Sequence, residues 1–235
     1  MTALKNPAKA KILSGYFKTG PGEYGEGDVF WGLTVPVLRK LVKKHRELEL
    51  GSILTLLQSS VHEQRLLSLL LLVHQYERGD APTRASIYRA YLANTQRINN
   101  WDLVDLSADR IVGAHLQGQS LEPLFELARS KDLWERRIAM LATFHFTKQE
   151  DPGPALEIAG LLVDDRHDLI HKAVGWMLRE VGKRCSVKAE EAFLERHAAT
   201  MPRTMLRYAI ERFPEPARRR YLETRTSCRR TGRGC

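Results

Sequence analysis

Apolar residues recur mainly three and four positions apart, and no segment alternates apolar and polar residues over the length of a strand. This periodicity predicts an all-α fold. Start signals support several helices, because Thr34, either Asn99 or Asn100, and Asp132 are good capping residues placed before periodic segments. The predicted helices cover about residues 4–18, 35–46, 48–59, 61–78, 82–93, 100–115, 119–129, 132–147, 153–163, 167–183, 187–199 and 202–212.

The helices are arranged as a repeat of two-helix units. The second helices of successive pairs begin near residues 61, 100, 132, 167 and 201, so the unit recurs every 32 to 39 residues. This interval is typical of solenoids, in which each pair buries its apolar face by stacking on its neighbours. We therefore expect one domain of antiparallel helix pairs over residues 1–213. An arginine-rich helix or tail, expected to be disordered at its end, would follow over residues 214–235.

Composition narrows the class of protein. Apolar residues make up 43% of the chain and charged residues 28%, which is typical of a globular protein. No apolar run approaches the roughly 20 residues of a membrane span, and no secretory signal is recognisable. Three cysteines without CxxC spacing indicate a reducing compartment, so we expect a location in the bacterial cytosol or nucleoid and no membrane partner.

The net charge of +9 favours a polyanionic partner, and most of it lies in residues 201–235. The same position in several of the two-helix units, called here the basic register, carries a basic residue. Arg137, Lys172 and Arg207 are each 35 residues apart, and Arg65 lies further upstream. These side chains could be an ordinary solvated face or a wall that follows a phosphate backbone. The second interpretation makes Lys172 and Arg207 candidate DNA contacts. Asp102 interrupts the same register, and a DNA groove would tolerate such an acid only opposite a positive charge.

Two tryptophans have charged neighbours one helical turn away. Trp101 and Asp105 share a helix face, and Lys172, Trp176 and Arg179 share another. Either tryptophan could simply fill the core, as Trp134 is expected to do. Spacing alone leaves Asp102 and Asp105 open as the acid that faces a ligand.

Three runs of the chain resemble the AlkD-type DNA alkylation-repair glycosylases: Asn100 to Asp105, Leu133 to Arg137, and Lys172 to Glu180. The glycine-rich segment Gly20 to Pro36 is also similar to that family's N-terminal pattern. The resemblance covers about residues 10–212. It implies a right-handed superhelix of HEAT-like helix pairs with a concave, basic DNA-binding surface. It further implies a monofunctional glycosylase that releases N3-methyladenine and N7-methylguanine without a metal or organic cofactor.

The resemblance also implies roles for single residues. Asp105 matches the family's catalytic aspartate. Trp101 and Trp176 match the two tryptophans that pack against the sugar–phosphate backbone at the lesion. Arg137 matches an arginine that contacts DNA beside the site, and Arg179 a further backbone contact.

The implied chemistry needs few groups. Alkylation at N3 or N7 makes the base cationic, so it can leave without a general acid. A carboxylate near the sugar would stabilise the positive charge that grows there and orient a water molecule. The resemblance suggests that the lesion stays stacked rather than being extruded into a pocket. The expected partner is double-stranded DNA carrying alkylated purines, bound by a monomer with no obligate protein partner.

Two other functions stay open at this point. The chain could be a non-catalytic DNA-binding member of the same repeat fold, or a HEAT-type scaffold whose basic wall binds an acidic protein. A metal site is not expected, because His167 and His171 lack the H-E-x-x-H pattern and a third ligand.

Overall fold

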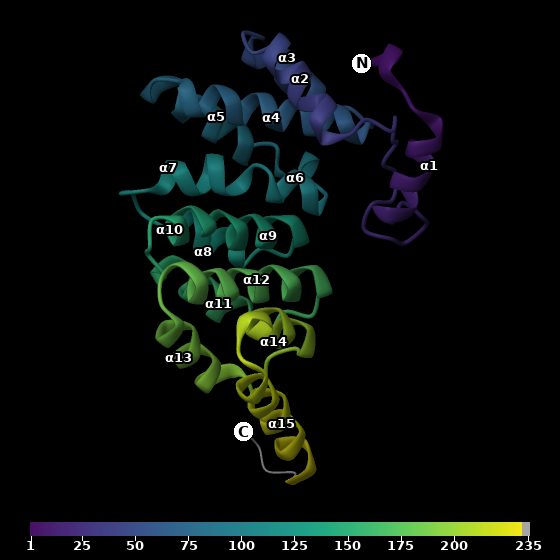
Figure 1. The fold of residues 1–235 in the computed structure, drawn as a ribbon. Helices are drawn as coiled ribbons and strands as arrows, with labels where there is room; N and C mark the ends of the chain where they lie inside the picture. Colours follow the sequence, from purple (N-terminus) through teal and green to yellow (C-terminus); the bar gives the residue numbers. More distant parts are fainter. Residues whose placement is uncertain (232–235) are drawn as a thin grey trace. The chain divides into compact units, whose positions relative to one another are not determined.

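The fold is helical throughout the part of the chain that the structure describes. The computed structural model describes the backbone of residues 1–231 and the side chains of residues 1–223. No strand forms in these residues, although Val29 and Val61 meet in an isolated parallel bridge. The all-α prediction is therefore confirmed. The chain divides into two compact units, residues 1–115 and residues 116–235, and Figure 1 shows the helices of each.

The first unit is built around one buried helix. It contains α1 (Pro7–Tyr16), α2 (Val35–Lys44), α3 (Leu50–Leu57), α4 (His62–Arg78), α5 (Ala81–Leu92), α6 (Trp101–Asp105) and the first two residues of α7 (Ala114–Leu116). The helices α2, α3, α5 and α6 all pack against α4. Residues 66–73 of α4 are buried on every side, because this stretch is apolar all round except for Ser68. Ser68 satisfies its hydroxyl by donating to the Ile53 carbonyl at 2.8 Å.

The predicted helix over residues 100–115 is interrupted. The helix α6 ends at Asp105, and a π-helical turn (Asp109–Gly113) precedes α7. Ser107 lies in the break, where its hydroxyl donates to the Leu103 carbonyl at 2.6 Å and lies 2.9 Å from the Tyr91 hydroxyl. Side chains of this kind compete with the backbone for helical hydrogen bonds. A π-helical turn holds one extra residue, a feature that often occurs beside functional sites.

The second unit stacks helix pairs. It contains α8 (Glu122–Ala128), α9 (Leu133–Ala142), α10 (Phe144–Lys148), α11 (Gly153–Leu162), α12 (Asp168–Arg184), α13 (Val187–His197), α14 (Arg203–Ala209) and α15 (Glu215–Thr231). Within the pairs, α8 packs on α9, and α11 and α13 pack on α12. Between the pairs, α12 contacts α9 on one side and α14 on the other. The predicted cap at Asp132 is confirmed, because its carboxylate accepts from the Trp134 and Glu135 amides.

The arginine-rich segment continues as a helix, α15, through Thr231. Residues 232–235, where disorder was expected, lie outside the described residues. Among the described helices, none is long and apolar enough to cross a membrane.

Gly175 permits the close crossing of α12 and α14. A Cβ atom at this position would lie 2.4 Å from the Met205 carbonyl oxygen and 2.5 Å from the Tyr208 Cβ. The backbones of α12 and α14 are therefore in direct contact at Gly175, the residue before Trp176.

We expect Gly175→Ala to lower the free energy of unfolding by about 1–3 kcal/mol, because the added methyl group forces the two helices apart. The matched control is Gly160→Ala on α11, where an added Cβ meets no atom within 4 Å. The control should gain about 0.5–1 kcal/mol from helix propensity. Urea denaturation followed by circular dichroism measures both, and equal stability of the two variants would contradict the close crossing.

Candidate functional site

Trp101 is the first residue of α6, and its position is fixed from two sides. Asn100 caps the helix and is fully buried, with its side-chain oxygen 2.9 Å from the Trp101 amide nitrogen. The indole stacks on the Phe17 ring, with centroids 5.1 Å apart and planes at 17°. The Tyr16 ring meets it edge-on at 5.8 Å. Trp101 is only half-buried, so it is held by aromatic contacts while part of it remains open to solvent.

The two candidate carboxylates occupy different environments. Asp102 is 8% exposed, and its Oδ2 lies 2.8 Å from Nε2 of His62. Asp105 is half-buried, lies one helical turn after Trp101 and is the last residue of α6 before the break. Asp102 is therefore bound to His62 inside the protein. Asp105 lies nearer the surface, on the same helix face as Trp101.

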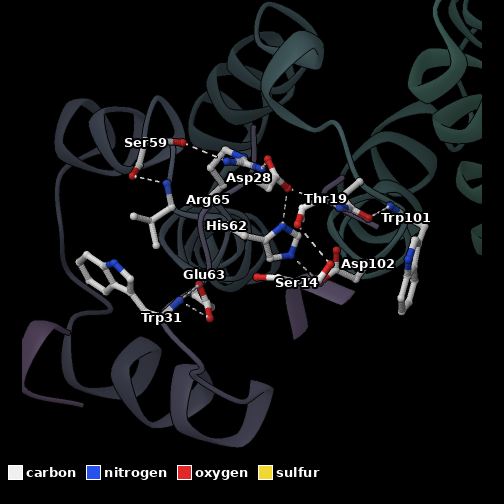
Figure 2. Close-up of polar contacts among 12 residues, drawn as sticks. Ser14, Thr19, Asp28, Trp31, Ser59, His62, Glu63, Arg65, Trp101 and Asp102 are labelled. Atoms are coloured by element: carbon white, nitrogen blue, oxygen red, sulfur yellow. Dashed lines mark hydrogen bonds and ion pairs between the residues drawn. The ribbon is translucent and has the colours of Figure 1, made fainter. Parts of the chain in front are cut away.

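A buried network that the sequence reasoning missed lies beneath these residues. His62, the first residue of α4, is 1% exposed. Its Nδ1 lies 3.1 Å from Asp28 Oδ2, and its Nε2 contacts Asp102 (Figure 2). Arg65 donates to the other Asp28 oxygen at 2.7 Å. Two carboxylates and two basic side chains thus meet in the core of the first unit.

The His62 imidazole is a cation in this setting. Burial alone lowers its pKa, but the hydrogen bonds to Asp102 and Asp28 outweigh that effect and raise the pKa to about 9. Burial tends to raise the pKa of Asp28, yet His62 and Arg65 hold it below its usual range. Phe30 stacks on the imidazole with ring centroids 4.6 Å apart. Both ring nitrogens can therefore donate, one to each carboxylate.

The neighbouring Glu63 binds the backbone of the N-terminal loop, residues 17–34, which also carries Asp28. Its carboxylate accepts from the amides of Trp31, Gly32 and Leu33 at 3.0, 2.7 and 3.1 Å (Figure 2 shows the Trp31 contact). Gly32 has a φ of +80°, which favours glycine. One turn of α4 thus holds the N-terminal loop with two consecutive side chains. The signal in the sequence was a polar pair, His62 and Glu63, at the start of an otherwise apolar helix.

In the second unit, α12 carries Trp176, Lys172 and Arg179. Trp176 is half-buried, with its ring 6.1 Å from that of Phe144. Lys172 pairs with Asp168 at 2.6 Å, one turn earlier on the helix. Arg179 pairs with Glu211. These predicted residues therefore share one helix, and both Lys172 and Arg179 already have carboxylate partners.

The basic register is not uniformly exposed. Arg207 on α14 is exposed. Arg137 is 5% exposed and donates to the Leu169 carbonyl, in the first turn of α12, at 2.6 Å. Arg65 is 3% exposed and pairs with Asp28, so the expectation that it lines an open wall is wrong. Charge pattern alone does not distinguish a basic residue that pairs internally from one that faces solvent.

Metal binding has no support in the described residues. No three histidine, cysteine, aspartate or glutamate side chains there converge as a metal ion requires. His167 uses Nδ1 to accept from the Leu169 amide, and His171 places Nε2 2.5 Å from the Asp165 carbonyl. The backbone therefore engages one nitrogen of each ring.

Comparison with known proteins gives consistent matches. Residues 1–213 match the model of a family described as DNA alkylation repair enzyme. A solved structure described as a predicted DNA alkylation repair enzyme from Enterococcus faecalis is similar in fold, with a TM-score of 0.70 and 19% sequence identity. The similarity covers 90% of this chain and 97% of that one. No curated protein matches the chain.

The pKa of His62 makes stability depend on pH. A pKa raised from 6.5 to about 9 stabilises the fold fully below about pH 6.5 and progressively less as pH rises through 9. We therefore expect His62→Gln to destabilise the protein most at about pH 6. The stability gap between wild type and variant should shrink by up to about 3 kcal/mol towards pH 10.

Urea denaturation at several pH values measures this gap. The control is His45→Gln, which removes a histidine at an exposed position after α2 rather than a buried one. A His62→Gln gap that stays constant from about pH 6 to about pH 10 would show that the imidazole is not a buried cation.

Proposed function

Because the chain belongs to the DNA alkylation repair enzyme family, we propose that it is a monofunctional glycosylase that releases cationic alkylated purines from duplex DNA. The family supports a role in DNA repair and in binding DNA. The observation that carries the finer proposal is the pair on α6, a half-buried Trp101 and the Asp105 carboxylate one turn later. N3-Methyladenine and N7-methylguanine are the proposed substrates.

The reaction suits a site with a single carboxylate. In the alkylated nucleotide the base already carries a positive charge. When the bond from C1′ to the base nitrogen breaks, the electron pair goes to the base and neutralises it. Positive charge then develops on the deoxyribose, and a water molecule adds at C1′ and loses a proton. Asp105 would stabilise the sugar cation and accept a hydrogen bond from that water, so no metal or organic cofactor is needed.

The surroundings of Asp102 support Asp105 as the acting group. Asp102 neutralises the buried His62 cation, and removing it from that contact would leave a charge unpaired in the core. Asp105 lies on the partly open face that it shares with Trp101. The two acids that sequence spacing left equivalent therefore differ in their availability to DNA.

The remaining predicted residues would bind the DNA backbone. Trp101 and Trp176 would pack against sugars beside the lesion, where an aromatic face also stabilises a cation by about 0.5–2 kcal/mol. Arg207 is exposed and could contact a phosphate directly. Lys172 and Arg179 would exchange their carboxylate partners for phosphates. Arg137 is buried and would act indirectly. It donates to the Leu169 carbonyl and so positions the first turn of α12, the helix that carries Lys172 and Trp176.

The proposal includes the larger architecture that the resemblance implied. The helix pairs would form a right-handed HEAT-like superhelix with a basic concave surface, acting as a monomer in the bacterial cytoplasm. The lesion would remain stacked, because the proposed contacts are made to sugar and phosphate rather than to an extruded base.

We expect Asp105→Asn to reduce base release from a duplex with one N7-methylguanine by about a hundredfold or more, because the charge that stabilises the sugar cation is lost. DNA affinity should stay the same or rise, since a carboxylate that repels phosphates is removed. Abasic-site formation under single-turnover conditions and fluorescence anisotropy measure the two quantities.

Asp102→Asn is the matched control. It should lower thermal stability, because His62 loses a carboxylate, while base release below the melting temperature persists. Loss of release in Asp102→Asn with full release in Asp105→Asn would move the catalytic role to Asp102. Wild-type protein that binds DNA in a salt-dependent way but forms no abasic sites would contradict the glycosylase proposal.

A further inference from the structure

The outer face of α1 carries large apolar side chains in solvent. Ile12 is 69% exposed and Tyr16 is 63% exposed, although both are large and apolar. They are four residues apart, so they lie on the same face of the helix, and Lys9 precedes Ile12 by three positions. The opposite side of this segment faces inward through Phe17, which is buried and stacks on Phe30.

The same segment is purely basic. Residues 1–22 contain four lysines and no aspartate or glutamate. Lys9 and Lys11 are exposed and flank Ile12, and neither makes an ion pair with any of the described residues. An apolar strip bordered by unneutralised lysines fits a partner that offers both apolar surface and negative charge.

Backbone contacts join the start of α1 to the loop of residues 17–34, and a further hydrogen bond closes that loop just after the helix ends. At the start of α1, the Asn6 amide donates to the Trp31 carbonyl at 2.8 Å. The Asn6 carbonyl also approaches Gly32 so closely that a Cβ there would lie 2.2 Å from it. At the end of α1, the Gly25 amide donates to the Lys18 carbonyl at 3.0 Å. A preorganised surface loses little conformational freedom on binding.

The exposed strip is continuous with the proposed DNA site. Tyr16 touches Trp101 edge-on at 5.8 Å, and Phe17 lies beneath the same indole. From Trp101 the strip passes to Tyr16 and then to Ile12 along α1. The loop that fixes α1 is the one that His62 and Glu63 hold (Figure 2).

We infer that this outer face of α1 is a second contact surface for the same DNA duplex, extending the interface from Trp101 away from the lesion. The inference rests on the proposed function for the identity of the ligand. Lys9 and Lys11 bind backbone phosphates, and Ile12 and Tyr16 pack against sugars and the edge of the minor groove. Proteins that bind the minor groove of DNA commonly combine inserted apolar side chains with lysine and arginine.

Salt-dependent binding of the full-length chain to a fluorescent duplex with one N7-methylguanine tests the inference. Each phosphate contact contributes about 0.9 to the slope of log K against log salt, so Lys9→Gln/Lys11→Gln should reduce the slope by about 1.8. Ile12→Glu should weaken binding about tenfold or more, because it places a carboxylate against the DNA.

The matched controls lie on α13, in the second unit. Lys188→Gln/Arg196→Gln also removes two exposed charges, and Val187→Glu places a carboxylate at a residue that is 52% exposed. Neither control should change the slope or the affinity. Circular dichroism verifies that every variant is folded.

The outcomes separate this inference from the glycosylase proposal. Base release by wild type, with α1 variants that bind DNA as tightly as wild type, would overturn the α1 surface alone. The α1 surface would then be assigned to lipid if the same variants lost binding to vesicles containing phosphatidylserine. Binding that depends on α1, without any base release, would support the surface and contradict the glycosylase.

Discussion

The arrangement of the first unit depends on one buried cation held between two carboxylates. His62 donates to Asp28 from the N-terminal loop and to Asp102 from α6, and so joins three segments that are far apart in sequence. Each partner is costly to bury alone, and the hydrogen bonds compensate that cost only while all three are in place. The network also anchors the residue next to Trp101, because Asp102 contacts His62, while Phe17 stacks on the Trp101 indole.

This dependence separates two kinds of charged residue in the chain. The Asp28, His62, Asp102 and Arg65 side chains neutralise one another inside the protein, with two charges of each sign. The lysines of α1 and Arg207 face solvent and have no such partners in the described residues. A net charge of +9 is thus a poor guide to where a polyanion binds, because part of the basic composition stabilises the fold.

Helix periodicity predicted most of the fold, because the apolar positions of α9 and α12 follow the 3.6-residue repeat and Asp132, a good capping residue, precedes α9. The position of Trp101 and Asp105 on one helix face was also predictable, since four-residue spacing guarantees it. The partners of His62 were not, because 34 and 40 residues separate it from Asp28 and Asp102. Only the tertiary fold brings such residues together, and for the same reason Arg65 looked like a surface residue.

The break after Asp105, a turn at residues 106–107 followed by the π-helical turn, changes which side of the segment faces inward. In an uninterrupted helix, each residue advances about 100° around the axis, so Ala108 and Val112 would point to the same side as Trp101 and Asp105. Both are fully buried instead. The turn at residues 106–107 and the extra residue of the π-helical turn together let one segment expose part of Trp101 and Asp105 and then bury Ala108 and Val112. The number of residues between Asp105 and Val112, rather than their identity alone, keeps the acid at the surface.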